Sequence, residues 1–389
     1  MITKIKKLAE SIFDEVVSIR RHLHKYPELS FKEHKTSAYI KSVLSSWNIP
    51  FTEDIADTGI VVLLKGNNPN SKTISLRADF DALPIIEDNE VDYCSVNNGV
   101  MHACGHDAHT ASLLGAINIL NTLNKEWEGS IKFIFQPAEE MLPGGAQQMI
   151  KEGVLENPKV EKMLGQHVFP DLEVGKVGFR PGKYMASTDE LHITIKGKGG
   201  HAALPEKYNS PLLAAAKLIT ALDEYSKKEK DRPCVLAIGF IEGLGSTNVI
   251  PEQVKLKGTL RAMDEDFRMK THEKMLAIAN TIAETYSLTI DFDIRKGYPC
   301  LVNHEALTKK SISFAKEYMG TENVIDLPIR MTAEDFAYYS QQVPSCFYRL
   351  GTANKSKGIT HGLHTSRFNI DESSLKSGMG LMAYLAIKN

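Results

Sequence analysis

The sequence predicts a two-domain α/β protein, in which a mixed sheet flanked by helices forms a discontinuous domain and a smaller α+β domain is inserted into it. Three observations lead to this fold class. A chain of 389 residues exceeds what one hydrophobic core usually organises. Strand and helix patterns alternate up to about residue 167, and two Gly/Pro breaks enclose a segment with a different order of elements.

The first part of the chain alternates between helix and strand patterns. Apolar spacing predicts helices over residues 5–26, 35–47, 108–123 and 144–152, and strands over 58–65, 72–78, 130–136 and 160–167. This βα alternation is typical of a sheet that has helices on both faces. We therefore expect the larger domain to be layered in this way.

The middle of the chain follows a different pattern, between the breaks RPGKYM at 180–185 and KGYP at 296–299. Strands are expected over 190–196, 235–242, 253–262 and 288–293, and helices over 210–225 and 268–283. That order is a split βαβ pattern. The predicted domains are 1–184 with 297–389, and an inserted domain over 185–296 that two adjacent chain crossings would allow to move.

Composition and charge exclude several classes of protein. A formal net charge of −2 gives no basic field for nucleic acid. The N-terminal segment lacks the apolar core of a signal peptide, and no apolar run approaches the roughly 20 residues that span a bilayer. Five scattered cysteines are typical of thiols in a reducing compartment. We expect a cytoplasmic protein with no membrane or nucleic-acid partner.

The densest group of candidate ligands is the segment HACGHD at residues 102–107. Thiolate, imidazole and carboxylate groups bind first-row divalent metals, and the glycine lets the backbone turn. On an extended segment His102, Cys104 and His106 would share one face. By itself the segment is also compatible with a structural accident, or with Cys104 as a nucleophile beside a histidine base.

A pair of carboxylates, Glu139 and Glu140, follows the apolar segment IKFIFQP. Adjacent side chains at a strand end point in different directions, so one can bind metal while the other takes a proton from water. A metal lowers the pKa of bound water from about 15.7 towards about 7. Such pairs are commonly solvated, but this one lies between a buried strand and Pro143-Gly144-Gly145.

Further histidines stand where elements end. His167 ends an apolar strand pattern, and His361 and His364 lie in THGLHT, but a histidine beside an apolar strand is usually a satisfied core group. The segment GKGGH suggests a glycine turn that exposes His201. This segment is not the G-x-G-x-x-G of a dinucleotide site, because Ala202 takes the sixth position.

Taken together, the motifs resemble the M20 metallopeptidase family, and more narrowly its amidohydrolase branch. The segments that carry the resemblance are RRHLHKYPELS, SLRADFDALP, HACGHDAHT, FQPAEE, GQH, GKGGHAALP and HTSRF. That branch includes hippurate hydrolases, N-acyl amino acid amidohydrolases, N-acetyldiaminopimelate deacetylases and auxin-conjugate hydrolases. The resemblance extends over residues 17–386, and it implies the fold of di-metal exopeptidases.

The resemblance implies a metal site with defined roles. It implies two divalent ions per subunit, zinc or manganese with cobalt or nickel as alternatives, and Glu139 as the base that activates the bridging water. Asp79 and Asp107 would orient the ligands. Relatives outside the branch carry a ligand histidine where this chain has Arg77. The implied metal ligands are Cys104, His106, Glu140, His167 and His364, with His102, His109 and His361 as neighbours only.

The resemblance also implies roles for the inserted domain. His201 would reach across a homodimer interface to polarise the scissile carbonyl, while Asn248 and Arg261 would meet the carbonyl or carboxylate of the substrate. Donors of this kind stabilise an oxyanion, and the arginine fork matches a carboxylate. An alternative for Arg261 is an exposed charge at a strand end. The resemblance thus makes residues 185–296 a lid and dimerisation domain, through which the homodimer would form.

The implied reaction is hydrolysis of N-acyl amino acids, of the N-acetyl or N-benzoyl type, to a carboxylic acid and a free amino acid. A metallo-dipeptidase or aminopeptidase with the same site is the alternative within enzymes. Two other classes are a cysteine hydrolase that uses Cys104, which chelator sensitivity would exclude, and a non-catalytic binding protein with the same fold.

Overall fold

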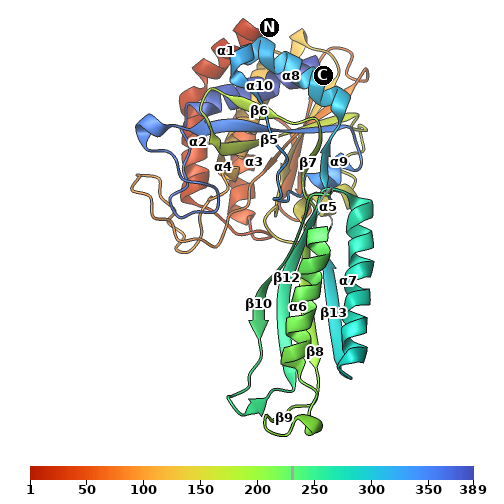
Figure 1. The fold of residues 1–389 in the computed structure, drawn as a ribbon. Coiled ribbons are helices and arrows are strands. Elements are labelled where there is room, and N and C mark those ends of the chain that lie inside the picture. Colours follow the sequence, from red (N-terminus) through yellow and green to blue (C-terminus); the bar gives the residue numbers. More distant parts are fainter. Residues whose placement is uncertain (229–231) are drawn as a thin grey trace. The chain divides into compact units, whose positions relative to one another are not determined.

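The computed structural model of the chain describes residues 1–228 and 232–389, which form two compact units (Figure 1). Unit 1 comprises Met1–Gly182, Val302–Pro328 and Asp335–Asn389. Unit 2 comprises Lys183–Leu301 and the short segment Ile329–Glu334. The sequence patterns gave no sign that this short segment belongs to unit 2.

Unit 1 is built on a mixed sheet of eight strands in the order β1-β2-β4-β3-β5-β16-β6-β15. β3 is parallel to β4 and β5, and β5 is parallel to β16, whereas β1, β2 and β4 pair antiparallel. The predicted mixed sheet is therefore confirmed. The strands are β1 (Phe51–Ile55), β2 (Gly59–Lys65), β3 (Thr73–Asp79), β4 (Ser130–Gln136), β5 (Lys162–Glu173), β6 (Val177–Phe179), β15 (Val324–Asp326) and β16 (Ser345–Ala353).

Helices cover both faces of this sheet. On β4, Phe133 and Phe135 belong to the main apolar core, to which α4 and α10 contribute, and both helices pack on β3. Lys132 alternates with these phenylalanines along β4, so its side chain points to the opposite face of the sheet. There its ammonium donates to the carbonyls of Val154 and Glu156, which follow α5. The helices are α1 (Ile2–Ser11), α2 (Phe13–Lys25), α3 (His34–Ser46), α4 (His106–Thr122), α5 (Gly145–Lys151), α8 (Glu305–Met319), α9 (Ala337–Ser340) and α10 (Ser374–Lys388).

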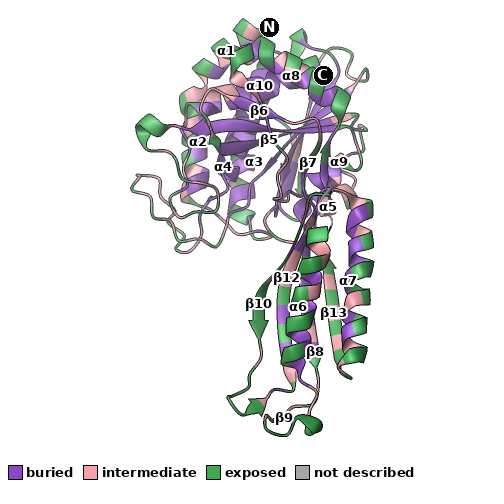
Figure 2. Cartoon of the chain, viewed as in Figure 1, coloured by how far each residue is buried: buried purple, intermediate pink, exposed green. Residues whose placement is uncertain are grey.

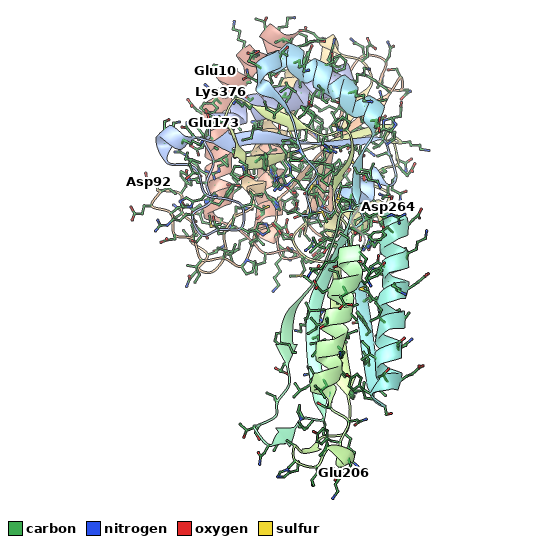
Figure 3. The ribbon with its side chains drawn as sticks, viewed as in Figure 1. Glu10, Asp92, Glu173, Glu206, Asp264 and Lys376 are labelled. Atoms are coloured by element: carbon green, nitrogen blue, oxygen red, sulfur yellow. The ribbon has the colours of Figure 1, made fainter. Side chains whose placement is uncertain are left out.

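The single helix expected over residues 5–26 is wrong, because the chain forms α1 and α2 with a break at Ile12. The backbone of Ile12 has φ −104° and ψ 5°, outside the helical range. Ile5 and Val16 are both buried, so the apolar spacing continues across the break and hides it. An ion pair of 2.7 Å between Glu10 and Lys376, both labelled in Figure 3, connects α1 to α10.

Unit 2 contains an antiparallel sheet in the order β10-β12-β8-β13, with α6 and α7 on one face. That order is the arrangement of a split βαβ fold. Figure 2 shows that each helix is buried on one side and exposed on the other. The elements are β8 (Asp189–Lys196), β9 (Gly200–His201), α6 (Pro211–Lys228), β10 (Cys234–Glu242), β11 (Val249–Ile250), β12 (Gln253–Ala262), α7 (Glu265–Thr285) and β13 (Thr289–Lys296). The paired strands β7 (Gly182–Met185) and β14 (Leu301–Asn303) lie where the chain passes from one unit to the other.

A buried charge network connects the sheet of unit 2 to α7. Asp189, which is fully buried, accepts hydrogen bonds of 2.9 Å from Arg268 Nε and 2.6 Å from His272 Nε2. Burial alone would raise the pKa of Asp189, but His272 and Arg268 outweigh it and lower the pKa to about 2.

This lowered pKa predicts an acid-sensitive stability. The folded chain binds the Asp189 proton more weakly than the unfolded chain, so the stabilisation is complete above about pH 4 and is lost as the pH falls through about 2. We expect Asp189→Asn to lose on the order of 2 kcal/mol of unfolding free energy at pH 7. Urea unfolding at pH 7, 4 and 2.5 should show the difference from the parent chain shrinking, and a constant difference would contradict this origin.

Among the described residues, no helix is both long and apolar enough to cross a membrane.

Candidate active site

The candidate site lies where strands β3, β4 and β5 end or pass the same edge of the sheet. The carboxyl ends of parallel strands meet at one edge, and this edge carries functional groups in many α/β proteins. Asp79 ends β3, and Glu139 and Glu140 follow β4. Arg77 pairs in register with Gly165, so His167 lies level with Asp79. The pairing of the strands therefore places the side chains of Asp79, His167 and the two glutamates at one edge of the sheet, although they are far apart in sequence.

Six predicted residues converge in unit 1. Within each group that the geometry defines, the potential ligand atoms lie no more than 4.8 Å apart. Cys104 Sγ lies 3.5 Å from His167 Nε2, and His364 Nε2 lies 3.1 Å from Glu140 Oε1. Cys104 belongs to two of the groups. The three groups made up of predicted ligands and Glu139 are Cys104–His106–His167, Cys104–Glu140–His364 and His106–Glu139–Glu140.

The expectation that His102 shares a face with Cys104 and His106 is wrong. Gly105 has φ +84°, and His106 is already the first residue of α4, so the segment turns instead of remaining extended. A Cβ at Gly105 would lie 2.5 Å from the Val168 side chain, which further restricts the position to glycine. His102 belongs to none of the groups, and burial lowers its pKa to about 4.

Hydrogen bonds fix which nitrogen of two histidines faces the site. His167 Nδ1 donates to the Val168 carbonyl at 2.7 Å, so Nε2 carries the lone pair that faces Cys104. His106 Nδ1 donates to Asp81 Oδ1 at 3.1 Å. No described group forms a hydrogen bond with His106 Nε2, although that atom is buried. Both rings therefore present a nitrogen suited to a metal.

The donors of this site fit divalent metal ions. A thiol, three imidazoles and two carboxylates form a set that borderline ions such as zinc accept. Burial, and then the charges of Glu140 and Glu139, raise the pKa of the Cys104 thiol. Burial lowers the pKa of His106, but Asp79 and Asp81 outweigh it and raise the pKa to about 10. The site thus concentrates negative charge that a cation would compensate.

Asp79 connects the two histidine-bearing elements. Its Oδ1 accepts from His109 Nδ1 at 2.5 Å, and His109 Nε2 in turn accepts the Val168 amide at 2.8 Å. Burial opposes the charge on Asp79, but the neighbouring Arg77 holds the pKa of this carboxyl well below its usual value. His109 therefore holds the backbone beside His167, a contact that the sequence did not indicate.

Arg77 on β3 forms hydrogen bonds with three buried side chains. Its guanidinium donates to Gln136 Oε1 at 2.8 Å, to Asp79 Oδ2 at 2.6 Å and to Asp335 Oδ1 at 2.7 Å. Asp335 also accepts the Ala146 amide at 2.9 Å. This buried cation therefore holds carboxylates in place and carries no lone pair for a metal.

Two further aspartates support α4 and the segment after β4. Asp107 forms an ion pair with Arg20, in which Oδ2 lies 2.8 Å from Nε, and accepts a hydrogen bond from His24 Nδ1 at 2.7 Å, which fixes the first turn of α4 to α2. Asp81, which sequence reasoning missed, lies beside His106 and also accepts the Glu140 amide at 2.9 Å. The alternation of Asp79 and Asp81 along the chain was the available signal.

His364 differs from the other candidate ligands because it is exposed, whereas Cys104 and His106 are buried. Its backbone amide donates to the Ala103 carbonyl at 2.8 Å, which ties its loop to the Cys104 segment. His361, three residues earlier, is exposed and belongs to none of the groups.

Unit 2 brings together two of its three predicted residues. His201 on β9 pairs with Val249 on β11, and the Ala202 amide donates to the Asn248 carbonyl at 2.9 Å. The Ala203 amide donates to His201 Nδ1 at 3.1 Å, so the neutral ring carries its proton on Nε2. Figure 3 labels Glu206 at this end of unit 2.

Arg261 lies elsewhere in unit 2, on β12, where it pairs in register with Val235. The residue is half-buried, so the simple alternative of an exposed strand-end charge is wrong. Burial lowers the pKa of its guanidinium. Within residues 1–228 and 232–389, no hydrogen-bond or ion-pair partner of the Arg261 side chain is found.

Comparison with known sequences identifies a family and relatives. The sequence model of peptidase family M20/M25/M40 matches residues 75–388. The provisionally named amidohydrolase YhaA of Bacillus subtilis is 37% identical over 99% of this chain and 97% of its own length. N-acetyl-L-cysteine deacetylase of Bacillus subtilis is 37% identical over 93% of this chain and 85% of its own length. Thermostable carboxypeptidase 2 of Saccharolobus solfataricus is 35% identical over 100% and 98%.

Solved structures share the fold over the same extent. A provisionally named aminohydrolase of methicillin-resistant Staphylococcus aureus has a TM-score of 0.93 at 33% identity, with 100% of both chains covered. YXEP of Bacillus subtilis, described as a dinuclear metal-binding peptidase, has a TM-score of 0.84 at 33% identity, with 97% of this chain and 98% of that chain covered.

Proposed function

Because the chain belongs to peptidase family M20/M25/M40, we propose that it is a two-metal amidohydrolase that cleaves N-acyl amino acids into a carboxylic acid and a free amino acid. Family membership makes it a hydrolase of amide C–N bonds. The observation that carries the finer proposal is that three groups of potential ligands share members: His106 and Glu140 link the group that contains Glu139 to the two groups that contain Cys104. A relative named as a deacetylase supports an N-acyl substrate.

The metal-binding role follows from the grouping of donors. We propose that Cys104, His106 and His167 hold one divalent ion, and that Glu140 and His364 hold the second together with Cys104. Zinc and manganese are the proposed ions, with cobalt or nickel as alternatives. When bound, such ions polarise the amide carbonyl and lower the pKa of a water molecule.

The proposed chemistry of the chain itself centres on Glu139. This carboxylate lies 4.0 Å from His106 Nε2, in the same group of atoms, and would accept a proton from the attacking water. It would then donate that proton to the departing amine nitrogen. The guanidinium of Arg261, which lacks a described partner, suits the substrate carboxylate, since an arginine fork accommodates two oxygens.

His201 is proposed to donate its Nε2 proton to the oxyanion, with Asn248 beside it, because Nδ1 already accepts a backbone hydrogen bond. We expect His201→Ala to lower kcat about 100-fold, the usual loss when one oxyanion donor is removed, with metal content unchanged. Steady-state kinetics beside metal analysis by mass spectrometry would measure both. Undiminished turnover in the variant would exclude this role.

A homodimer through unit 2 is part of the proposal. β10 is an edge strand of its sheet, and most of its residues are exposed (Figure 2). Its apolar side chains Val235, Phe240 and Ile241 are between 40% and 56% exposed, which is unusual for an edge strand that faces water. A second copy of the chain would cover them. Sedimentation velocity that finds only monomer would remove the role of His201 across the interface.

The test of the function is release of free amine from a panel of N-acetyl, N-benzoyl and longer N-acyl amino acids beside dipeptides, with manganese or zinc and with chelator. We expect chelator-sensitive hydrolysis that favours N-acyl amino acids. Cleavage of dipeptides alone would establish the alternative, a metallopeptidase, which the carboxypeptidase-named relative favours. Chelator-insensitive cleavage would indicate a Cys104 hydrolase. Metal-loaded protein without turnover would indicate a binding protein.

We also propose a cytoplasmic location, which the five free cysteines support. No nucleic-acid or membrane partner is part of the proposal, in keeping with the net charge of −2.

A further inference from the structure

The segment that carries Glu139, between β4 and α5, has an unusual backbone. Ala138 has φ +52°, a left-handed conformation that residues other than glycine rarely adopt. Gly145 then approaches the segment so closely that a Cβ would lie 1.9 Å from the Pro137 carbonyl oxygen. A turn of this kind persists only where its surroundings hold it.

Two buried carboxylates hold the amides on either side of Glu139. Glu33 Oε1 accepts the Ala138 amide at 2.8 Å, and Asp81 Oδ2 accepts the Glu140 amide at 2.9 Å. Glu33 lies far from this segment in sequence, directly before α3, and it is fully buried. The direction of the Glu139 side chain is therefore fixed from both neighbouring peptide groups.

The burial of Glu33 is difficult to explain by stability alone, because it lowers the free energy of unfolding. In the part of the chain that the structure describes, its side chain forms no ion pair. Besides the Ala138 amide, the carboxylate accepts the Thr58 hydroxyl at 3.4 Å and interacts with the backbone amides of Phe31 and of Glu33 itself. A buried carboxylate without a cation is unfavourable, and burial, followed by the charge of Asp81, raises the pKa of Glu33 to about 7. Groups held at such a cost are concentrated at functional sites.

We propose that Glu33 is a positioning residue for the reaction: by accepting the Ala138 amide, it holds the left-handed turn that aims Glu139 at the reacting water. The inference rests on the proposed function of Glu139 as the base. It assigns Glu33 no contact with substrate or metal. Glu33 would affect turnover only through the orientation of the Glu139 side chain. A small displacement of that carboxylate from the reacting water would lower kcat strongly.

The test compares Glu33→Ala with Glu33→Gln. Glutamine retains an acceptor oxygen for the Ala138 amide, whereas alanine removes it. We expect Glu33→Ala to lower kcat about 10- to 100-fold, with KM and the content of two metal ions unchanged. Glu33→Gln should restore most of the turnover. Glu28→Ala is the matched control. Glu28 lies in the same segment between α2 and α3 and also accepts a backbone amide, that of Thr36 at 2.8 Å, but it has no hydrogen bond to Ala138 among the described residues.

A second measurement does not depend on turnover. Hydrogen–deuterium exchange of the peptide that covers residues 136–145, in metal-free protein, should be about 10-fold faster in Glu33→Ala and unchanged in Glu33→Gln and Glu28→Ala. If Glu33→Ala does not fold, Glu33→Asp replaces it, since the side chain is one methylene too short to reach Ala138 and should show the same deficit.

The outcomes separate this inference from the proposed function. Equal kcat and equal exchange in Glu33→Ala and Glu33→Gln would overturn the role of Glu33 while leaving the amidohydrolase in place. Loss of metal in Glu33→Ala would also overturn it, since the residue would then support the ligands. If the parent chain cleaves none of the panel, the proposed function fails, and the exchange measurement alone decides whether Glu33 holds the turn.

Discussion

Glu139→Gln is expected to lower the turnover of N-acyl amino acids by about 10³-fold while the protein still binds two metal ions. The amide of glutamine has nearly the shape of the carboxylate, so the packing around this buried position is kept. It cannot accept a proton from water at neutral pH, and the proton transfer to the leaving amine is lost as well.

Glu140→Ala is the matched comparison on the neighbouring residue. It should lose activity together with metal, because Glu140 lies in the group with Cys104 and His364. Metal content measured by mass spectrometry beside kcat distinguishes the two variants. Parental turnover in Glu139→Gln would eliminate Glu139 as the base, and metal loss in that variant would make it a ligand instead.

The second large effect is expected from Arg77→Met, which should lower the free energy of unfolding by about 3–5 kcal/mol. Methionine fills much of the arginine volume but leaves Asp79 and Asp335 without their buried cation. Two carboxylates that repel each other, both fully buried, would then have to be protonated or rehydrated. Urea unfolding of metal-free protein at pH 7 measures the loss.

Lys132→Met provides the control for a buried cation on the adjacent strand. The Lys132 ammonium donates to three backbone carbonyls, at 3.0 Å to Val154, 2.6 Å to Glu156 and 3.1 Å to Pro158, so its removal leaves no uncompensated charge. Its cost should be about 1–3 kcal/mol. If Arg77→Met costs no more than Lys132→Met, the charge compensation argued for Arg77 is wrong.

Much of the fold could be predicted because burial leaves a periodic signature. Strands β4 and β12 have the bounds that the apolar pattern gave, 130–136 and 253–262. The break at Ile12 could not be predicted, since apolar positions continue through it. The assignment of Ile329–Glu334 to unit 2 depends on tertiary contacts alone, and no local pattern records it.

The candidate site divides in the same way. Residues that we propose to act through their own side chains, such as Cys104 and Glu139, stand in dense motifs of the sequence. Residues that act through the backbone of others do not: Asp335 and Glu33 each lie more than a hundred positions from the amides they hold. The prediction that His102 lies on the same face as Cys104 and His106 assumed an extended segment. It is wrong because the chain turns at Gly105 and enters α4 at His106.

The position of β16 in the sheet of unit 1 has a consequence for biosynthesis. β16 lies between β5 and β6, yet the ribosome makes it after the whole stretch Lys183–Leu301 of unit 2. A nascent chain that has exposed β6 must therefore keep a strand-wide gap beside β5 until the last part of the protein emerges. All of unit 2 has been synthesised by then, so the domain that appears second during translation has the first opportunity to finish folding.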